Sequence, residues 1–229
     1  MKEIVKFIKE GLKITSKTKV VKYNYHPKTK KELQDLLNQL IEERGNEGDF
    51  NDIDTSEITD MTDLFYDINK FNGDISKWEV SNVVDMNSMF YKCKSFNCDI
   101  SKWDVSNVTN MNGIFYGCES FNQDISKWNV SNVTSMMYMF YGCKSFNQPL
   151  NNLDVSNVTD MHYMFGGSGS FNQSLDKWDV SNVIDMNYMF SNCKVFNQDI
   201  SNWHISNLEY WNGIFYKCPI EEKYKPKFK

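Results

Sequence analysis

The sequence predicts an α/β solenoid of about seven 25-residue strand–helix coils, closed at its start by an N-terminal helical cap. Three observations predict this fold. One pattern of residues returns every 25 positions without an insertion. Apolar residues in each copy follow first the spacing of a strand and then that of a helix, and an amphipathic helix with its own start and stop signals precedes the first copy.

Aromatic, sulfur-containing and polar residues all follow the 25-residue period. The period covers six full units between residues 53 and 202 and part of a seventh that ends near residue 219. Because one unit cannot bury several aromatic side chains by itself, we expect like residues of neighbouring units to stack in columns inside the solenoid. The Trp column is Trp78, Trp103, Trp128, Trp178 and Trp203, the Met column runs from Met61 to Met186, and two Phe columns run from Phe65 to Phe215 and from Phe71 to Phe196.

Residues 1–27 form a basic N-terminal segment. The apolar residues between Ile4 and Leu12 fall at helical spacing, which predicts either a docking peptide or a marginal surface helix that needs a partner. Lysines interrupt this stretch and no small-residue cleavage site follows it, so the start does not resemble a secretory signal. No cysteine near the N-terminus offers a lipid anchor, and we therefore expect a cytoplasmic or phage-associated protein.

Residues 28–52 hold the predicted capping helix and the lead-in to the repeats. Thr29 as N-cap and Glu32 three residues later form a capping box, and Gly45 is a typical helix stop. The spacing of the apolar residues predicts a helix over roughly 30–44 that covers the open end of the first coil. Its apolar face is Leu33, Leu36, Leu37, Leu40 and Ile41.

Residues 53–219 hold the repeats, and the third full unit illustrates their elements. Trp103 and Val105 alternate with polar residues, which predicts a short, half-buried strand. A helix of about two turns is predicted next, capped by Ser106 or Asn107. Its apolar face is Val108, Met111, Ile114, Phe115 and Cys118.

The end of the repeat region differs from its middle. Trp211 takes the place of Met in the last unit, and Pro219 ends the pattern. Residues 220–229 form a basic C-terminal tail that we expect to be loose.

An Asn follows every residue of the second Phe column. A polar side chain at an apolar turn is tolerated only when it is hydrogen-bonded. We therefore expect a buried structural ladder in which these side chains bond the turn backbone of neighbouring coils. Its members are Asn72, Asn97, Asn122, Asn147, Asn172 and Asn197.

The charge is distributed unevenly along the chain. Residues 1–31 carry +8 and residues 217–229 carry +3, which leaves −16 for residues 32–216 because the whole chain carries −5. An acidic middle repels nucleic acid, so no specific nucleic-acid partner is expected. No apolar stretch approaches the roughly 18 residues that a membrane span needs, so no transmembrane segment is expected either.

The repeated unit resembles a known family. The stretch from Asp104 to Trp128, which reads DVSNVTNMNGIFYGCESFNQDISKW, and the lead-in from Asp52 to Met61 are similar to BspA-like leucine-rich-repeat surface proteins, also described as the domain-of-unknown-function 285 family. The resemblance covers residues 28–219 and implies a leucine-rich-repeat-like solenoid from bacteria or their phages. It further implies a location at the cell surface, a role in adhesion or interaction, no catalytic activity and no cofactor.

Two rows of charged residues on the exposed side of the predicted strands are the first candidate binding face. They form either a self-neutralising ladder of ion pairs or a regular face that recognises an extended partner. The rows are Lys77, Lys102, Lys127 and Lys177, and beside them Glu79, Asp104, Asp154 and Asp179.

Six tyrosines on the predicted helix side are the second candidate. Rows of exposed tyrosines suit a protein or glycan partner, and half-buried packing between coils is the alternative. The residues are Tyr91, Tyr116, Tyr138, Tyr141, Tyr163 and Tyr188.

No other residues form a recognisable catalytic or metal-binding motif. A column of cysteines, with Ser168 in one slot, lacks zinc-ligand spacing and predicts small buried hydrophobes. The aligned aspartates are expected to accept backbone hydrogen bonds, with cation binding as the alternative. These rows are Asp74, Asp99, Asp124 and Asp199, and Asp60, Asp85, Asp160 and Asp185.

The repeats without a catalytic motif predict a non-enzymatic scaffold for protein–protein interaction with a host or cell-surface partner. The alternative is a structural or delivery component, such as a phage or intracellular assembly protein, docked through its N-terminal segment. The partner and the oligomeric state do not follow from the sequence.

Overall fold

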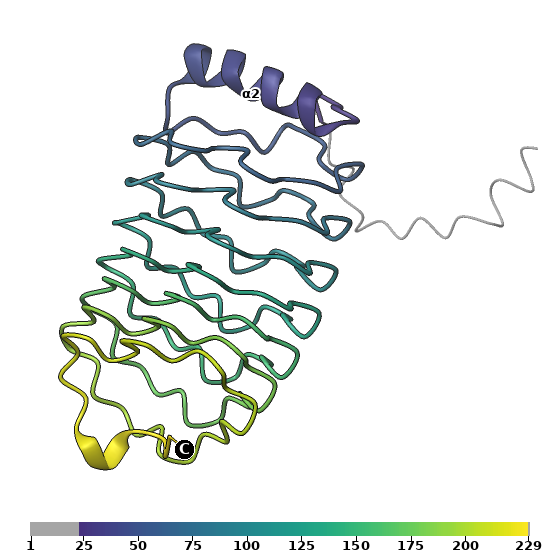
Figure 1. The fold of residues 1–229 in the computed structure, drawn as a ribbon. Coiled ribbons are helices and arrows are strands. Elements are labelled where there is room, and N and C mark those ends of the chain that lie inside the picture. The colour runs from purple at the N-terminus through teal and green to yellow at the C-terminus, as the bar shows by residue number, and fades with distance from the viewer. Residues whose placement is uncertain (1–22, 229) are drawn as a thin grey trace, which may run out of the picture.

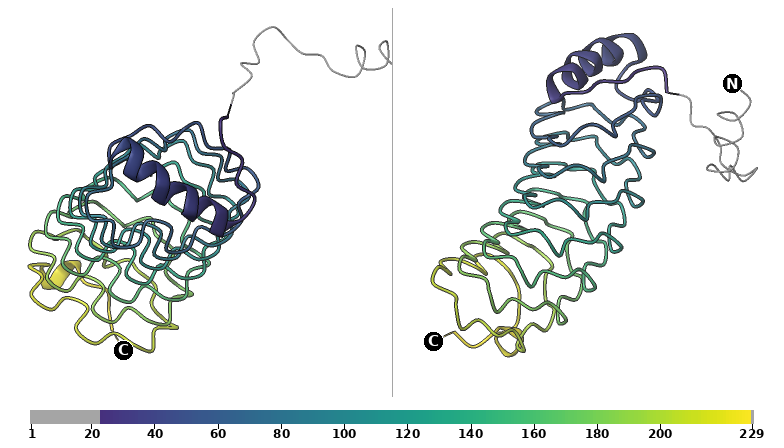
Figure 2. Two further views of the ribbon diagram at one scale, coloured as in Figure 1. Left: turned by 90° about the horizontal axis from the view of Figure 1, so that it is seen from above. Right: turned by 90° about the vertical axis from the view of Figure 1, so that its right-hand side faces the viewer.

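The computed structural model describes residues 23–228, which wind into a stack of similar coils (Figure 1). The α-helix α2 (Lys30–Arg44) lies at the start of the stack, and the short 3-10 helix η1 (Glu222–Tyr224) lies at its end. Figure 2 shows α2 lying across the end of the stack and shows that the stack is curved. The amphipathic stretch from Ile4 to Leu12, with its predicted docking role, lies outside the described residues.

The predicted strand–helix coil is wrong. Within residues 23–228, α2 is the only α-helix and no continuous strand forms, so the fold is not an α/β solenoid of the leucine-rich-repeat kind. Neighbouring coils instead meet in isolated parallel bridges. Six of these form one series, with one bridge between each coil and the next, from the Asp60–Asp85 pair to the Asp185–Tyr210 pair.

Hydrogen bonding explains why no helix forms in the repeats. The N–H of Ile114 donates to the carbonyl of Met111 and closes a turn, whereas the N–H of Gly113 donates to the carbonyl of Met137 in the next coil. An α-helix would direct both N–H groups to carbonyls four residues earlier in the same segment. The segment is therefore a chain of overlapping turns whose remaining N–H groups join the coils.

The backbone angles exclude a helix independently. Gly113 has φ +57° and Gly117 has φ +69°, and the equivalent positions of other coils hold non-glycine residues such as Lys92 (φ +57°) and Tyr138 (φ +59°). Left-handed residues four positions apart cannot belong to a right-handed helix. Apolar residues three and four positions apart also occur in successive turns. Because helices and successive turns share this spacing, the sequence predicted a helix where turns form.

The predicted strand is also replaced by turns. The backbone N–H of Trp103 donates to the carbonyl of Ile100 in the same coil, while its indole Nε1 donates to the carbonyl of Ile75 at 3.2 Å. The amide Nδ2 of Asn107 similarly donates to the carbonyl of Ser81 at 2.7 Å. Side chains thus provide the links between coils on this side, so no backbone ladder is needed.

One continuous apolar core runs through the whole stack. The Phe and Trp columns are buried as expected except at Phe215, which is half-buried, and rings of neighbouring coils stack with small interplanar angles. Phe65 and Phe90, for example, have ring centroids 5.4 Å apart at 5°. Each such pair contributes about 0.5–1.5 kcal/mol beyond the burial of its area.

The predicted Asn ladder forms hydrogen bonds, although its members are half-buried or exposed rather than buried. Oδ1 of Asn122 accepts the backbone N–H of Asn147 at 2.9 Å, and the same bond joins each neighbouring pair from Asn72 to Asn197. Glu221 continues the ladder by donating its N–H to Asn197 at 2.8 Å. One side-chain oxygen in each coil therefore satisfies a backbone donor of the next.

The two ends of the stack are closed differently. The helix predicted at 30–44 is confirmed as α2, with the Thr29 side chain accepting the N–H of Glu32 and Gly45 at its C-terminal end. At the other end, residues 220–228 are not loose, because Ile220 and Pro226 are buried and Ile200 donates its N–H to the carbonyl of Tyr224. Trp211 in the last coil nevertheless stays 42% exposed.

Replacing Asn122 by Ala is expected to lower the free energy of unfolding by about 1–2 kcal/mol, because the backbone N–H of Asn147 then loses its acceptor. Chemical denaturation of the purified protein measures this change. Asn122→Asp keeps an acceptor oxygen and is the matched control, so it should lose clearly less. Equal losses in the two variants would contradict the structural role of the side-chain oxygen.

Candidate binding surfaces

All eight residues of the predicted charged face are exposed. They flank the buried Trp column, because Lys77 precedes and Glu79 follows Trp78, and the same order returns in later coils. Alternation around a buried tryptophan therefore places a lysine row and an acidic row side by side along the stack. We call these four lysines, Lys77, Lys102, Lys127 and Lys177, the lysine row.

The self-neutralising ladder of ion pairs does not form in the part of the chain that the structure describes. None of the row lysines makes an ion pair there. The acidic neighbours are engaged elsewhere: Oδ1 of Asp104 accepts the N–H of Ser106 at 3.1 Å. Hydrogen bonds from the side chain and backbone of Ser106 hold the pKa of Asp104 below its usual value.

A second acidic row lies on the other side of the lysines. Oδ1 of Asp99 accepts the N–H of Ser101 at 2.9 Å, and Asp124 and Asp199 repeat this turn. Hydrogen bonds from Ser101 lower the pKa of Asp99, and the charge of Lys102 lowers it further. The face therefore carries a positive stripe between two negative stripes.

The six predicted tyrosines lie together and are all half-buried. Tyr91 stacks on Tyr116 with ring centroids 4.4 Å apart, and Tyr138 stacks on Tyr163 at 5.3 Å. With Tyr66 at its exposed start, the first column is Tyr66, Tyr91, Tyr116 and Tyr141, and the second is Tyr138, Tyr163 and Tyr188. We call these two columns the tyrosine surface.

The two columns meet edge to face. Tyr138 and Tyr141 have centroids 5.7 Å apart at an interplanar angle of 74°. Burial, together with the neighbouring hydroxyls of Tyr91 and Tyr141, raises the pKa of Tyr116 to about 12. Tyr116 at the junction of the two columns is therefore uncharged at physiological pH.

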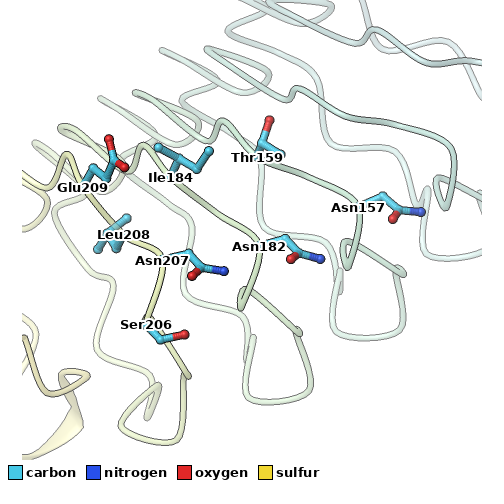
Figure 3. A pocket seen from close by; sticks show the side chains of 8 residues that line it. All are labelled: Asn157, Thr159, Asn182, Ile184, Ser206, Asn207, Leu208 and Glu209. Carbon is cyan, nitrogen blue, oxygen red and sulfur yellow. The ribbon is translucent and has the colours of Figure 1, made fainter.

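A groove of about 650 Å³ on another part of the surface crosses the last three coils. Figure 3 shows its asparagines in line on successive coils. The Nδ2 of Asn182 donates to the carbonyl of Ser156 at 2.8 Å, so the amide groups of this row have a fixed orientation. The groove is lined by Asn157, Thr159, Asn182, Ile184, Ser206, Asn207, Leu208 and Glu209.

Four of the cysteines, Cys93, Cys118, Cys143 and Cys193, act as buried hydrogen-bonding side chains. Sγ of Cys118 donates to the carbonyl of Phe90 at 3.0 Å, and Ser168 makes the same bond to Phe140 through its hydroxyl. Burial raises the pKa of the Cys93 thiol to about 12 and that of Cys118 well above its usual value, so both thiols stay protonated at neutral pH. Protonated, buried thiols are poor nucleophiles and poor metal ligands.

The other predicted row of aspartates takes part in local contacts. Asp160 accepts the N–H of His162 at 2.9 Å, and its relatives Asp60, Asp85 and Asp185 accept equivalent bonds. Burial raises the pKa of Asp160, and the charge of Asp185 adds to this effect. Within residues 23–228 we find no group of three or more His, Cys, Asp or Glu side chains placed to hold a metal ion.

Several residues of these surfaces are not among the predicted ones, although the sequence contains a signal for some of them. Tyr66 lies one period before Tyr91 and could have been found from the period alone. The Asn row of the groove has the same period. His162, whose Nε2 lies 3.2 Å from the hydroxyl of Tyr138, carried no such signal, because no other coil holds a histidine at that position.

The sequence model of one protein family matches residues 34–152 and 123–225, and this family is described as "Mycoplasma protein of unknown function, DUF285". The comparison with curated proteins found no match, and neither did the comparison with solved structures. No helix in the described part of the chain combines the length and the apolar character that crossing a lipid bilayer requires.

Because burial raises the pKa of the Cys93 thiol, we expect the protein to lose stability in alkaline solution. The pKa of Cys93 is about 12 in the folded protein and 9.0 for a free thiol, so the unfolded chain loses this proton first. The stability that the buried thiol contributes below pH 9.0 is therefore lost as the pH rises toward about 12.

Denaturant unfolding between about pH 8 and pH 10.5 tests this directly. Cys93→Ser keeps a donor for the carbonyl of Phe65, as Ser168 does in its own coil, but does not titrate. The variant should lose less stability than the parent, by up to about 1.4 kcal/mol per pH unit. If the free energy of unfolding falls equally with pH in the two proteins, the raised pKa of Cys93 does not cause the loss of stability.

Proposed function

We propose that this chain, which belongs to the DUF285 family, is a non-enzymatic repeat scaffold that binds a protein partner along its lysine row. The observation that carries the proposal is that the lysines of the charged face are unpaired within residues 23–228. They are also exposed, while the adjacent carboxylates are held in their own turns. The lysine ammonium groups are thus available to carboxylates of another molecule.

The regular spacing of the coils favours an extended contact. Each coil adds one lysine or asparagine to the row, at the spacing of neighbouring strands, about 4.8 Å. A single exposed ion pair contributes only about 0–1 kcal/mol, so useful affinity needs several such contacts in line. The flanking negative stripes would repel the carboxylates of a partner that lies out of register. This repulsion increases the specificity of binding more than its affinity.

The setting of the proposed interaction comes from the resemblance of the repeat to BspA-like surface proteins. On that basis the partner belongs to a host or to a cell surface. This part of the proposal rests on the repeat sequence, whereas the contact itself rests on the charged face.

Charge reversal tests the proposed contact. The double substitution Lys102→Glu and Lys127→Glu should weaken binding to an affinity-captured partner at least about tenfold and reduce its association rate, because two positive contacts become repulsive. Surface plasmon resonance at two salt concentrations measures both effects. We expect the effect to be smaller at high salt.

The matched control is the pair Lys94→Glu and Lys194→Glu. These lysines are also exposed and the change in net charge is identical, but they lie in a different row. The control should bind like the parent protein. Unchanged affinity in the Lys102 and Lys127 variant, or equal weakening in both variants, would remove the lysine row from the proposal.

A further inference from the structure

The second tyrosine column stops within the stack, although its backbone position continues in earlier coils. Tyr138, Tyr163 and Tyr188 occupy three successive coils, whereas Gly113 and Ser88 take the equivalent positions in the two coils before them. All of these positions have positive φ, between 52° and 59°. The backbone therefore keeps the same form where the ring is missing.

The missing rings leave a recess at the end of the column. Tyr138 stacks with one face on Tyr163, at 5.3 Å and 8°, and meets Tyr116 at 5.9 Å and 62°. Tyr138 also lines a recess of about 330 Å³. It is lined by Asn87, Ser88, Tyr91, Asn112, Gly113, Tyr116, Met137 and Tyr138.

A side chain placed at Gly113 would meet no clash at its first atom. A Cβ atom built at Gly113 would lie 3.5 Å from Oγ of Ser88 and 3.7 Å from Cβ of Tyr116, which are ordinary contacts. The other end of the column differs, because a Cβ atom at Gly213 would clash with the ring of Tyr188. The next coil thus covers Tyr188, and within residues 23–228 the column is open at Tyr138.

We propose that this recess binds a neutral pyranose ring of a saccharide, stacked on Tyr138 in the place of the missing tyrosine. A pyranose has one flat face of C–H groups, whose partial positive charge suits the negative face of an aromatic ring. Its hydroxyl groups need hydrogen-bond partners at the rim. The recess supplies both kinds of contact.

The polar rim contains oriented donors. Oδ1 of Asn112 accepts the N–H of Met137 at 3.0 Å and the hydroxyl of Ser135 at 2.6 Å, which turns its Nδ2 group the other way. That Nδ2 group has no acceptor among residues 23–228, and the amide of Asn87 and the hydroxyl of Ser88 lie on the same rim. An aromatic side chain of a partner protein would fill the space but would leave the Nδ2 group of Asn112 without an acceptor.

The charge of the recess selects against ionic ligands. Every lining residue is uncharged, so a phosphate or carboxylate would lose hydration without gaining a counter-charge from the residues that line the recess. The platform itself is held in place, because the hydroxyl of Tyr138 lies 3.2 Å from Nε2 of His162. A held aromatic face with neutral polar groups at its edge is a preorganised site for a neutral, hydroxyl-rich ring.

This site goes beyond the proposed function and is independent of it. The recess belongs to the tyrosine surface and contains no residue of the lysine row. Charge reversal of Lys102 and Lys127 should therefore leave saccharide binding unchanged, and the two proposals can fail separately.

Saturation-transfer NMR with maltotriose, cellotriose and N,N′,N″-triacetylchitotriose tests the site. At least one of these neutral trisaccharides should receive saturation at its ring C–H protons from the full-length protein. Gly113→Tyr should weaken this binding at least about tenfold by filling the recess, and Tyr138→Ala should do so by removing the platform. Tyr188→Ala removes an equally stacked tyrosine outside the recess and should bind like the parent protein.

The variants separate binding from folding. Tyr is already accommodated at φ +59° at position 138, so Gly113→Tyr should fold, and its thermal unfolding is checked alongside. The proposal is overturned if no trisaccharide receives saturation, if binding persists in Gly113→Tyr, or if Tyr188→Ala loses binding as strongly as Tyr138→Ala. A separate titration with p-cresol identifies a site for aromatic side chains, and p-cresol binding without trisaccharide binding also overturns the proposal.

Discussion

The hydrogen bonds from one coil to the carbonyls of the next are the constraint on which the rest of the structure depends. In the third full unit, Gly113, Phe115 and Gly117 each donate a backbone N–H to a carbonyl of the following coil. The N–H groups between them close turns within the coil. This alternation fixes the register of each coil on the next and leaves none of these backbone donors unpaired.

The register determines the core and the surface together. Because each coil repeats the same turns, side chains at equivalent positions stack, and one core of Phe, Trp and Met runs along the molecule. The same rule lines up exposed side chains as rows. The lysine row and the tyrosine surface are therefore consequences of the backbone register. Where one coil departs from the pattern, as Gly113 does in a tyrosine column, a local recess forms.

Part of this architecture could be predicted from the sequence. The helix at 30–44, the buried aromatic columns and the exposure of the charged rows follow from periodicity and capping residues, and they are found in the structure. The elements within each coil could not be predicted in this way, because overlapping turns place apolar residues three and four positions apart just as a helix does. Lys92 and Tyr138 at positive φ gave no warning, since such residues rarely adopt that conformation. The saccharide recess required the spatial relation between Tyr138, Gly113 and Tyr116, which no local pattern reveals.

Nuclear Overhauser contacts in the isotope-labelled protein test the central claim most directly. We expect contacts between the amide proton of Gly113 and protons of Met137 and Tyr138, because Gly113 donates its N–H to the carbonyl of Met137 at 2.8 Å. Equivalent contacts should also join all the remaining pairs of neighbouring coils. An unbroken series of helical contacts between residues three and four positions apart over 108–118, without contacts to Met137 or Tyr138, would contradict this claim.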